Sequence, residues 1–333
     1  MKYLITGAAG FIGSNLSARL ANSGHEILGV DNYSTYYSPD LKHMRVANIL
    51  TPLNVTVTDS DLSDLANTRD LVHSFSPDHI VHLAAQPGVR TPLGMSYQYI
   101  QNNLVGYANI LQAAVMEEVP NFLYASSSSV YGNSTNIPYK ESDSGIRPIS
   151  IYGATKLANE ILTPSFIQGS KTKARGMRFF TVYGPWGRPD MAYFRIVNSV
   201  LNGGEFKKFG DGRIKRDFTF IDDISASIEA LSAELVQREP GYSDIVNIGG
   251  GNPYSLNDLI EVIEQHTGTN AKISLSEKNP NDISYTCADV EFLHELTRSI
   301  PKVDLREGVK QTIDWAKNFN ITKSLPAWIA STN

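Results

Sequence analysis

The stretch Leu4-Ile-Thr-Gly-Ala-Ala-Gly-Phe-Ile-Gly13 decides the fold. It ends an apolar run and opens a helical pattern, and its glycines Gly7, Gly10 and Gly13 are spaced G-x-x-G-x-x-G. Glycine lets the backbone turn tightly and approach a diphosphate, and the N-terminus of the following helix offers free N–H groups and a positive dipole end. The plainer alternative is a tight strand-to-helix turn without a ligand. We predict that this stretch is the dinucleotide-binding turn of a parallel α/β sheet.

Asp31 supports the ligand-binding alternative. It ends the second apolar run, Glu26–Val30, and Asn32 follows it. A carboxylate at this place accepts hydrogen bonds from the ribose hydroxyls of an adenosine and repels a 2′-phosphate, so it favours NAD over NADP. No arginine stands beside Asp31 in the sequence. The plainer alternative for Asp31 alone is a turn-capping residue before Asn32, but together with the glycine loop it predicts an NAD site.

Strand-like and helix-like stretches alternate through the first two-thirds of the chain. The expected strands are Lys2–Thr6, Glu26–Val30, Leu53–Val57, His79–Leu83, Asn121–Ser126 and Ala174–Thr181. The expected helices are Phe11–Ser23, Leu62–Ser74, Ser96–Glu118 and Ile151–Gln168, and Pro164 is expected to kink or end the last of them. Near-continuous apolar strands that alternate with helices predict a Rossmann-type, doubly wound parallel sheet with helices on both faces.

A second, smaller part of the chain is expected after Gly184, where a turn-rich stretch begins and the alternation stops. We predict an NAD-binding Rossmann domain over residues 1–184, with returning segments at about 217–250. In these segments, Phe218–Phe220 and Ile245–Ile248 are expected to form strands that rejoin the main sheet. Residues 185–216 and 251–333 are expected to form a smaller α/β domain that binds the substrate.

The composition narrows the class of protein. The 333 residues are 41% hydrophobic and 19% charged, as in a globular protein, and the net charge of -5 argues against a nucleic-acid partner. The one cysteine, Cys287, suits a reducing compartment, and Met1 runs into the first strand without a targeting leader. No apolar run is long enough to cross a bilayer, and none of the 7 histidines has a metal-binding spacing. We expect a cytoplasmic protein with no metal and no membrane partner.

Tyr152 and Lys156 stand four residues apart at the start of the last expected helix, so they share one face of it. A phenol has a pKa of about 10 and is a poor base at neutral pH. A nearby ammonium and a positively charged nicotinamide ring favour the phenolate, which can take a proton from a sugar hydroxyl while hydride leaves the same carbon. Most pairs with this spacing lie on helix surfaces. A catalytic role for Tyr152 and Lys156 is indicated only because the same chain also carries the glycine loop and the serine-rich strand end.

Eight motifs together carry a resemblance to a known family. They are GAAGFIG (7–13), DNYSTYYSPDLK (31–42), HLAAQPGVR (82–90), NNLVG (102–106), SSSSVYG (126–132), YGATK (152–156), RFFTVYGPWGRPDM (178–191) and RDFTFIDD (216–223). The chain resembles the extended short-chain dehydrogenases/reductases of the NAD-dependent epimerase/dehydratase family, and among them the UDP-glucuronate 4-epimerases. The resemblance implies an isomerase that converts UDP-glucuronate to UDP-galacturonate through a 4-keto intermediate and keeps NAD bound.

The resemblance assigns catalytic roles to three residues. Tyr152 is the expected base, Lys156 lowers its pKa, and Ser127, five residues before the glycine of VYG, orients the sugar 4-hydroxyl. Ser128 and Ser129 stand where relatives that dehydrate the sugar carry Asp-Glu and where UDP-glucuronate decarboxylases carry a Glu. The missing acid speaks against dehydration and disfavours decarboxylation, and both serines are expected to contact the sugar ring.

The resemblance also implies the binding residues. Arg188 offers a two-point fork for the substrate carboxylate, and Thr181 stands where hexose epimerases have Asn, so both are expected to hold a uronate. The residues expected on the UDP moiety are Phe209, Arg213, Arg216 and Asp282. The residues expected on NAD are Gly7, Gly10, Phe11, Ile12, Gly13, Asp31, Asn32, Ser34, Asp61, Leu62, Leu83, Ala84, Ala85, Gln86, Asn103, Tyr152 and Lys156.

Three other interpretations stay open at this point. A C4 epimerase of a neutral UDP-hexose does not need Arg188, and a UDP-glucuronate decarboxylase releases CO2. A non-catalytic NAD-binding protein commonly lacks the Tyr or the Lys, both of which are present here. The family dimerises through helices that match Ser96–Glu118 and Ile151–Gln168, so the resemblance also implies a homodimer.

Overall fold

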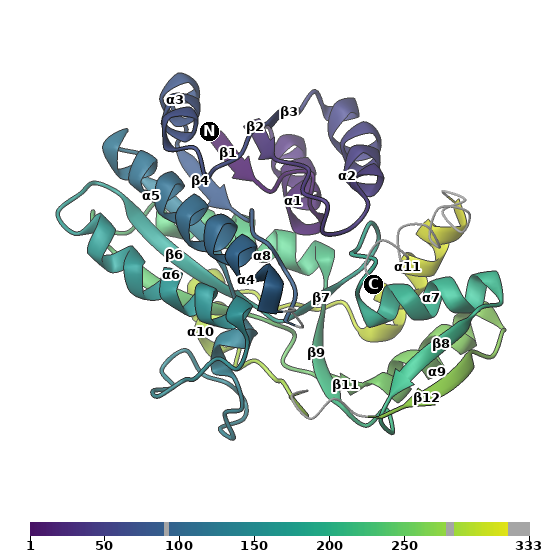
Figure 1. Cartoon of the computed structure of the whole chain (residues 1–333). Helices are drawn as coiled ribbons and strands as arrows, with labels where there is room; N and C mark the ends of the chain where they lie inside the picture. The colour runs from purple at the N-terminus through teal and green to yellow at the C-terminus, as the bar shows by residue number, and fades with distance from the viewer. Residues whose placement is uncertain (90–92, 278–282, 319–333) are drawn as a thin grey trace.

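The computed structural model describes residues 1–89, 93–277 and 283–318 (Figure 1). Its largest unit is a seven-stranded parallel sheet in which the strands lie in the order β10-β6-β5-β4-β1-β2-β3. These strands are β1 (Lys2–Thr6), β2 (Glu26–Asp31), β3 (Thr56–Asp59), β4 (His79–His82), β5 (Asn121–Ser127), β6 (Lys173–Phe179) and β10 (Ser243–Ile248). The strand order reverses between β1 and β4, so the predicted Rossmann-type, doubly wound sheet is confirmed.

Alternate residues of a strand face two different helix layers. Tyr3 and Ile5 pack into one core with α1 (Phe11–Asn22) and α8 (Ile221–Leu235). Leu4, between them, packs into a second core on the opposite face. The helices of that layer are α3 (Leu65–Phe75), α5 (Gly106–Met116) and α6 (Ile151–Ile167). Because neighbouring side chains of a strand point to opposite faces, both faces of this sheet need an apolar cover. Figure 1 shows helices on both faces of the sheet.

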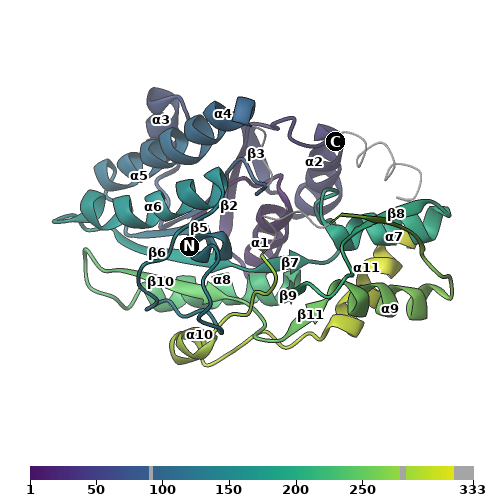
Figure 2. The same ribbon diagram turned by 60° about the horizontal axis from the view of Figure 1, so that its bottom comes forward.

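Two small sheets form a second unit, one in the order β11-β9-β7 and one that pairs β12 with β8. Their strands are β7 (Thr181–Tyr183), β8 (Glu205–Phe209), β9 (Lys215–Phe220), β11 (Pro253–Ser255) and β12 (Lys272–Ser276). The remaining helices of this half of the chain are α7 (Ala192–Asn202), α9 (Leu256–Thr267), α10 (Glu291–Thr297) and α11 (Leu305–Asn318). Figures 1 and 2 both place α7, α9 and β8 together, away from α3 and α5. Within the described ranges, none of the helices is long and apolar enough to span a bilayer.

The strands of the second unit correct one expectation. Phe218–Phe220 does not rejoin the main sheet, because it belongs to β9, which pairs with β7 and β11. Ile245–Ile248 lies in β10 and pairs with β6, as expected. The expected strand Ala174–Thr181 is divided at Phe180: β6 ends before it, and β7 leaves the main sheet and offers β9 a parallel edge. The division into two domains at the boundaries given above stays a prediction.

The ends of several elements also differ from the expected ones. The strand expected at Leu53–Val57 begins only at Thr56, because Pro52 suits the first turn of a short helix that Asn54 ends with a φ of 56°. Pro164 does not end α6, which continues to Ile167. The long helix expected from residue 96 to 118 is interrupted by the π-helical segment η4 (Gln101–Val105).

The other short helices of the described residues are α2 (Pro39–Arg45), η1 (Val46–Leu50), η2 (Thr51–Leu53), η3 (Leu93–Met95), α4 (Ser96–Ile100) and η5 (Ser128–Tyr131).

Candidate active site

A cavity of about 1210 Å³ lies between the carboxyl ends of the main strands and the second unit. The residues that follow β1, β2, β4 and β5 form one side of it, and the turn between β7 and α7, together with β8 and β9, forms the other. Ligands of doubly wound sheets bind at this edge, where the strand order reverses. A pocket for one small ligand usually measures about 300–1,000 Å³, so this cavity has room for more than one.

The glycine loop can fold as tightly as it does only because its glycines lack side chains. A Cβ atom on Gly13 would lie 2.1 Å from the carbonyl oxygen of Gly7, and one on Gly7 would lie 2.8 Å from the amide nitrogen of Ala84. Gly10 is the N-cap of α1, makes no side-chain cap, and is followed by a first turn without an acidic residue. The N–H groups and the positive dipole end of α1 are therefore offered to an anion. These residues fit the diphosphate of a dinucleotide.

Asp31 lies at the end of β2, and several donors share its carboxylate. It accepts hydrogen bonds from the amide nitrogen of Ala9 at 3.2 Å and from that of Tyr33 at 2.8 Å. The buried Lys42 Nζ lies 3.1 Å from Asp31 Oδ1 and 3.2 Å from Ser34 Oγ. Lys42 is therefore a cation beside Asp31 in the structure, although it stands eleven residues away in the sequence and reaches Asp31 from α2. A ribose at Asp31 would meet Lys42 and Ser34 as well.

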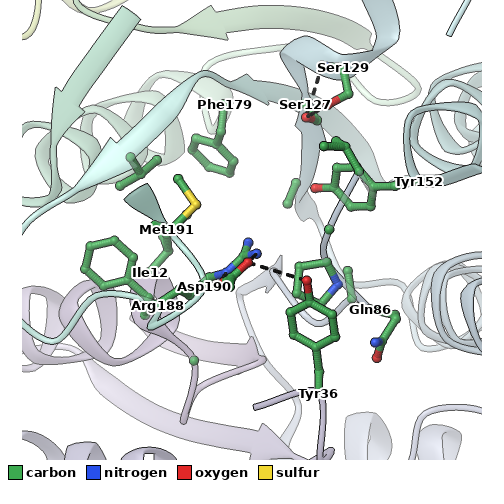
Figure 3. A pocket seen from close by; sticks show the side chains of 18 of the residues that line it. Ile12, Tyr36, Gln86, Ser127, Ser129, Tyr152, Phe179, Arg188, Asp190 and Met191 are labelled. Carbon is green, nitrogen blue, oxygen red and sulfur yellow. Dashed lines mark hydrogen bonds and ion pairs between the residues drawn. The ribbon is translucent and has the colours of Figure 1, made fainter. Parts of the chain in front are cut away.

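Tyr152, Lys156 and Ser127 line the cavity. Figure 3 shows Tyr152 and Ser127 on the same side of it. Ser150 caps the start of α6 with its side chain. A Cβ atom on Gly153, in the first turn, would lie 2.7 Å from the carbonyl oxygen of Ser129, so the helix begins beside the serine-rich end of β5. Tyr152 and Lys156 follow one turn apart, with Lys156 Nζ 5.9 Å from the centroid of the Tyr152 ring. Ser127 Oγ lies 3.1 Å from Ser129 Oγ and accepts a hydrogen bond from the Ser129 amide at 3.1 Å. The strand end and the helix start thus present a hydroxyl, a phenol and an ammonium to one space.

Burial is the largest cause of the pKa shifts of Tyr152 and Lys156. It raises the pKa of the Tyr152 phenol, whereas the Arg188 cation and then the Ser127 hydroxyl act in the opposite direction. Burial lowers the pKa of the Lys156 ammonium to about 8, and the Glu160 carboxylate acts against this shift. Positive charge beside the phenol lowers the pKa of Tyr152 and so opposes the effect of burial. Arg188 and a cationic nicotinamide ring are the groups that can supply it.

Arg188 lies across the cavity from Tyr152 and is already engaged by Asp190 (Figure 3). Arg188 Nε donates to Asp190 Oδ1 at 3.0 Å, and Arg188 Nη2 pairs with Asp190 Oδ2. Tyr36 Oη donates to the same Oδ2 at 3.4 Å, and its ring centroid lies 5.8 Å from the Arg188 guanidinium carbon. A substrate carboxylate would therefore approach an arginine of which Asp190 occupies one edge.

The cavity brings together most of the site residues expected from the sequence. These lining residues are Gly7, Gly10, Phe11, Ile12, Gly13, Asp31, Asn32, Ser34, Asp61, Leu62, Leu83, Ala84, Ala85, Gln86, Ser127, Ser128, Ser129, Tyr152, Lys156, Thr181, Arg188, Phe209 and Arg216. Asn103 is not a lining residue, but it holds Gln86 by hydrogen bonds to its backbone nitrogen at 2.7 Å and its backbone oxygen at 3.1 Å. Arg213 is turned away: its side chain is 85% exposed and lies 3.5 Å from Asp211. Asp282 lies outside the described residues.

Several residues of the site were not expected from the sequence. Tyr36 and Lys42 lie inside the motif DNYSTYYSPDLK, and Asp190 lies two residues after Arg188 in RFFTVYGPWGRPDM, so a closer use of these motifs could have found them. Lys207 also lines the cavity, with Nζ 5.5 Å from the centroid of the Phe209 ring. No signal in the sequence distinguishes Lys207 from other surface lysines.

The cavity is more positive than the chain as a whole. Its cationic lining residues are Lys42, Lys156, Arg188, Arg195, Lys207 and Arg216, and its acidic ones are Asp31, Asp61 and Asp190. The complete chain carries a net charge of -5. A local excess of cations raises the concentration of anionic ligands in a cleft, whatever the sign of the total charge. The cavity therefore suits phosphate-containing ligands.

The sheet, the glycine loop and the cavity define a dinucleotide-dependent enzyme of the Rossmann class. A family model described as "NAD dependent epimerase/dehydratase family" matches residues 3–249. The chain belongs to this family, and its cofactor is NAD.

Relatives along the whole chain agree with this assignment. A probable UDP-glucuronate 4-epimerase of Rhizobium meliloti is 36% identical over 95% of this chain and 96% of its own length. UDP-glucuronate 4-epimerase 4 of Arabidopsis thaliana is 36% identical over 95% of this chain and 75% of its own length. The crystal structure of UDP-glucuronic acid 4-epimerase from Bacillus cereus with UDP-glucuronic acid and NAD has a TM-score of 0.87 and 32% identity, over 96% of this chain and 100% of the other. The resemblance inferred from the motifs is confirmed.

Proposed function

We propose that this protein is a UDP-glucuronate 4-epimerase, which interconverts UDP-glucuronate and UDP-galacturonate. The observation that carries the proposal is the presence of Arg188 in the same cavity as Tyr152, Lys156 and Ser127. A cation suited to a carboxylate thus faces the groups suited to move a proton. The names of the relatives that cover nearly the whole chain support the same substrate.

Tyr152 is the proposed base. Its phenolate takes the proton of the sugar 4-hydroxyl, which Ser127 orients, and it later returns a proton to the new 4-hydroxyl. Lys156, Arg188 and the cationic nicotinamide ring of bound NAD together favour the phenolate. When bound, NAD would supply a reversible hydride acceptor at C4. The 4-keto sugar would turn in the cavity between the two hydride transfers, so that its opposite face receives the returning hydride. The glycine loop, Asp31 and the other lining residues named above would hold this cofactor.

The 4-keto intermediate carries a hazard, because its C6 carboxylate stands β to the ketone. If the C5–C6 bond aligned with the carbonyl π system, it would break and CO2 would leave. The electron pair of that bond would pass into an enolate, and a proton would then add at C5. We propose that Arg188 and Thr181 hold the carboxylate out of this alignment. A guanidinium is suited to this task because its two-point contact fixes the plane of a carboxylate.

The other lining residues are proposed to bind the rest of the substrate. Ser128 and Ser129 would contact the sugar, Arg216 the diphosphate and Phe209 the uracil. Lys207 lies beside Phe209, at the end of the cavity formed by β8 and β9, and adds positive charge there. These assignments agree with the excess of cations in the cavity.

A C4 epimerase of a neutral UDP-hexose is the second candidate. The observation in its favour is Asp190, which already neutralises one edge of Arg188. A UDP-glucuronate decarboxylase has less support, because no acid stands at Ser128 or Ser129. The products formed from UDP-glucuronate distinguish the three.

We also propose a homodimer in the cytoplasm. Tyr97 and Ile100 on α4 are 68% and 43% exposed, and Ile161 on α6 is 67% exposed. Large apolar side chains exposed on helices of one layer suit the surface of a second copy. A monomeric mass by light scattering at micromolar concentration would contradict the dimer. The single cysteine, Cys287, suits a reducing cytoplasm.

The first test is to incubate the purified protein with UDP-glucuronate, without added NAD, and to separate the products by chromatography with mass detection. UDP-galacturonate of unchanged mass is the expected product, because NAD is regenerated in every cycle and stays bound. A product lighter by the mass of CO2 would favour decarboxylation. An absence of reaction with UDP-glucuronate, together with turnover of UDP-glucose, would favour the neutral hexose.

Tyr152→Phe tests the proposed base. The variant keeps the ring but loses the hydroxyl, so we expect it to bind NAD while its turnover falls by about 10²–10⁴-fold, the range for a lost general base. The amount of NAD that the purified variant releases on denaturation serves as the control for folding. Turnover equal to that of the wild type would contradict the assignment of Tyr152.

A further inference from the structure

Arg45, the last residue of α2, is completely buried and connects two loops that lie far apart in the sequence. Its Nε donates to the carbonyl oxygen of Trp186 at 2.8 Å, and its Nη2 donates to that of Gly187 at 2.9 Å. Its Nη1 donates to the carbonyl oxygen of Ala9 at 3.2 Å and to Tyr37 Oη at 2.6 Å. Ala9 belongs to the glycine loop, and Trp186 and Gly187 immediately precede Arg188 in the chain.

The turn that Arg45 holds is under strain. Trp186 has a φ of 62°, a left-handed conformation that a residue with a bulky side chain adopts only when its surroundings impose it. Gly187 has no space for a side chain, because a Cβ atom there would lie 1.5 Å from Tyr193 Oη. On the other side, the Trp186 ring packs on Trp315 with their centroids 5.2 Å apart. Strained turns of this kind concentrate at functional sites, where the strain fixes a geometry.

We propose that Arg45 is a positioning residue for the uronate site. It fixes the Trp186–Gly187 turn against the glycine loop and thereby holds Arg188 where it meets the substrate carboxylate. This inference rests on the proposed function. It adds a residue that lies outside the cavity lining and acts only through the backbone that carries Arg188.

Two consequences separate this role from a merely structural one. First, a displaced Arg188 would let the C6 carboxylate of the 4-keto intermediate rotate, so more turnovers would end in CO2. This share is counted over turnovers, so it does not depend on the fraction of protein that is folded. Second, a displaced Arg188 would weaken the binding of UDP-glucuronate and leave the binding of UDP-glucose, which has no carboxylate, unchanged.

The test compares NAD-containing wild type with Arg45→Met, Arg45→Lys and Arg188→Ala. UDP-glucuronate labelled with ¹³C at C6 gives the ratio of labelled CO2 to UDP-galacturonate, and titration calorimetry gives the dissociation constants of UDP-glucuronate and UDP-glucose. Arg175→Met is the matched control, because Arg175 is likewise completely buried and outside the cavity lining, but its hydrogen bonds go to Leu231, Glu234 and Asp244 instead of the turn before Arg188.

We expect Arg45→Met to reduce kcat/KM for epimerisation by about 10²-fold, the loss that a misplacement of about 1 Å causes. The share of CO2 should rise as it does in Arg188→Ala, and the affinity for UDP-glucuronate should fall relative to that for UDP-glucose. Arg45→Lys keeps the charge but has no fork for two adjacent carbonyls, so its effects should be intermediate. Arg175→Met should keep the product ratio of the wild type.

The inference is overturned if the Arg45 variants keep the product ratio and the relative affinity of the wild type while Arg188→Ala changes both. If Arg45→Met does not fold, Arg45→Lys decides in the same way. If the wild type epimerises nothing, the proposed function fails. The ratio of the two dissociation constants then still tests Arg45, because it needs no turnover.

Discussion

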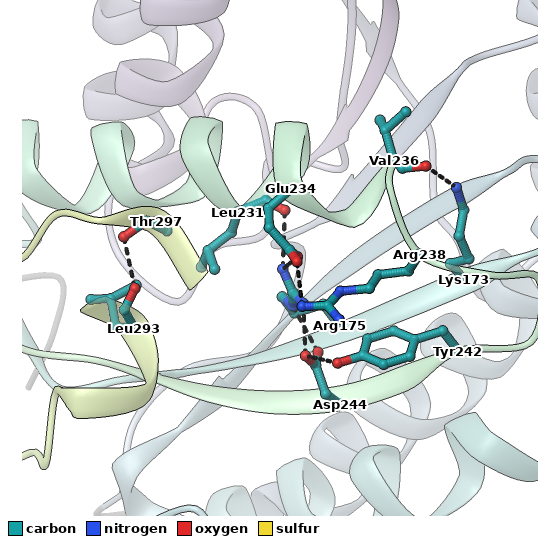
Figure 4. A network of polar contacts seen from close by, with 10 residues as sticks. All are labelled: Lys173, Arg175, Leu231, Glu234, Val236, Arg238, Tyr242, Asp244, Leu293 and Thr297. Atoms are coloured by element: carbon teal, nitrogen blue, oxygen red, sulfur yellow. Dashed lines mark hydrogen bonds and ion pairs between the residues drawn. The ribbon is translucent and has the colours of Figure 1, made fainter. Parts of the chain in front are cut away.

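Arg175 and Arg45 are both completely buried, but their charges are balanced in different ways. Arg175 on β6 binds two carboxylates: Nη1 lies 2.6 Å from Glu234 Oε2, and Nη2 lies 2.7 Å from Asp244 Oδ2 (Figure 4). Its Nε also donates to Asp244 Oδ1 at 2.7 Å. In the described part of the chain, Arg45 makes hydrogen bonds only to carbonyl and phenol oxygens. One buried cation is therefore neutralised, and the other is not.

Arg175 is paired with carboxylates at the edge of the sheet, whereas Arg45 and Lys156 lie near the cavity without such pairs in the part of the chain that the structure describes, and this difference matches what each region is proposed to do. The Arg175 network joins β6, α8 and β10 at one edge of the main sheet, where no ligand needs its charge. Lys156 resembles Arg45, because it is 1% exposed and no carboxylate forms an ion pair with it among the described residues. Burying such cations costs stability. Around the cavity, this cost preserves a positive potential for the phosphates and the carboxylate that the proposed function requires.

The strongest test of this comparison is Arg175→Met. The substitution leaves Glu234 and Asp244 without their shared cation, and we expect the free energy of unfolding to fall by about 3–5 kcal/mol, as when one partner of a buried pair is removed. Urea unfolding monitored by circular dichroism measures the change. A loss below about 1 kcal/mol would mean that water or Arg238, which also pairs with Glu234, compensates the two acids.

Lys156→Met should have the opposite effect on stability. In the folded protein, burial lowers the pKa of Lys156 from 10.5 to about 8, a difference that corresponds to about 3 kcal/mol. Between these two pH values the unfolded chain binds more protons, so the stability of the wild type rises with pH there. We expect the NAD-free variant to be more stable than the NAD-free wild type by about 3 kcal/mol at pH 7, with the difference shrinking above pH 8.

Urea midpoints of both NAD-free proteins between pH 7 and 9.5 measure this convergence. Two stability curves that stay parallel over this pH range would show that folding does not lower the pKa of Lys156. The same variant should lose epimerase activity, because the phenolate of Tyr152 loses a supporting cation. Stability and activity should therefore change in opposite directions.

Asp190→Asn tests Arg188, whose charge is balanced less fully than that of Arg175 and more fully than that of Arg45. Arg188 is 26% exposed and Asp190 is 19% exposed, so their pair is worth about 1 kcal/mol. Without the competing carboxylate, the KM for UDP-glucuronate should fall by about fivefold, which corresponds to that free energy. The affinity for UDP-glucose should not change. An increase of the KM would show that Asp190 orients Arg188 for substrate rather than competing with it.

The sequence predicted those parts of the site that depend on local backbone demands. The glycine loop was found because a tight turn and a close approach require glycine at Gly7, Gly10 and Gly13. Tyr152 and Lys156 were expected on one helix face because they stand four residues apart, and the structure places both at the cavity, while their catalytic roles stay a prediction. The order of strands and helices followed from apolar periodicity, although the fate of Phe218–Phe220 did not, since β7 and β9 pair in a separate sheet.

The partners of the charged groups were not predicted. Lys42 reaches Asp31 because α2 folds back over the end of β2, and Asp190 turns onto Arg188 within a tight turn. An arginine or a lysine has the same appearance in the sequence whether it is solvated, paired or isolated in the core. Which of these holds depends on the side chains that surround it.

The sequence by itself therefore determined the class of sheet, the cofactor loop and the face of the helix that carries Tyr152 and Lys156, because each of these is encoded within a few neighbouring residues. Only the tertiary structure decided which buried cations are neutralised. Arg175 meets its carboxylates, and Arg45 meets the turn before Arg188, through contacts between segments that are distant in the chain. Such contacts depend on how the layers pack, and no local pattern of residues records them.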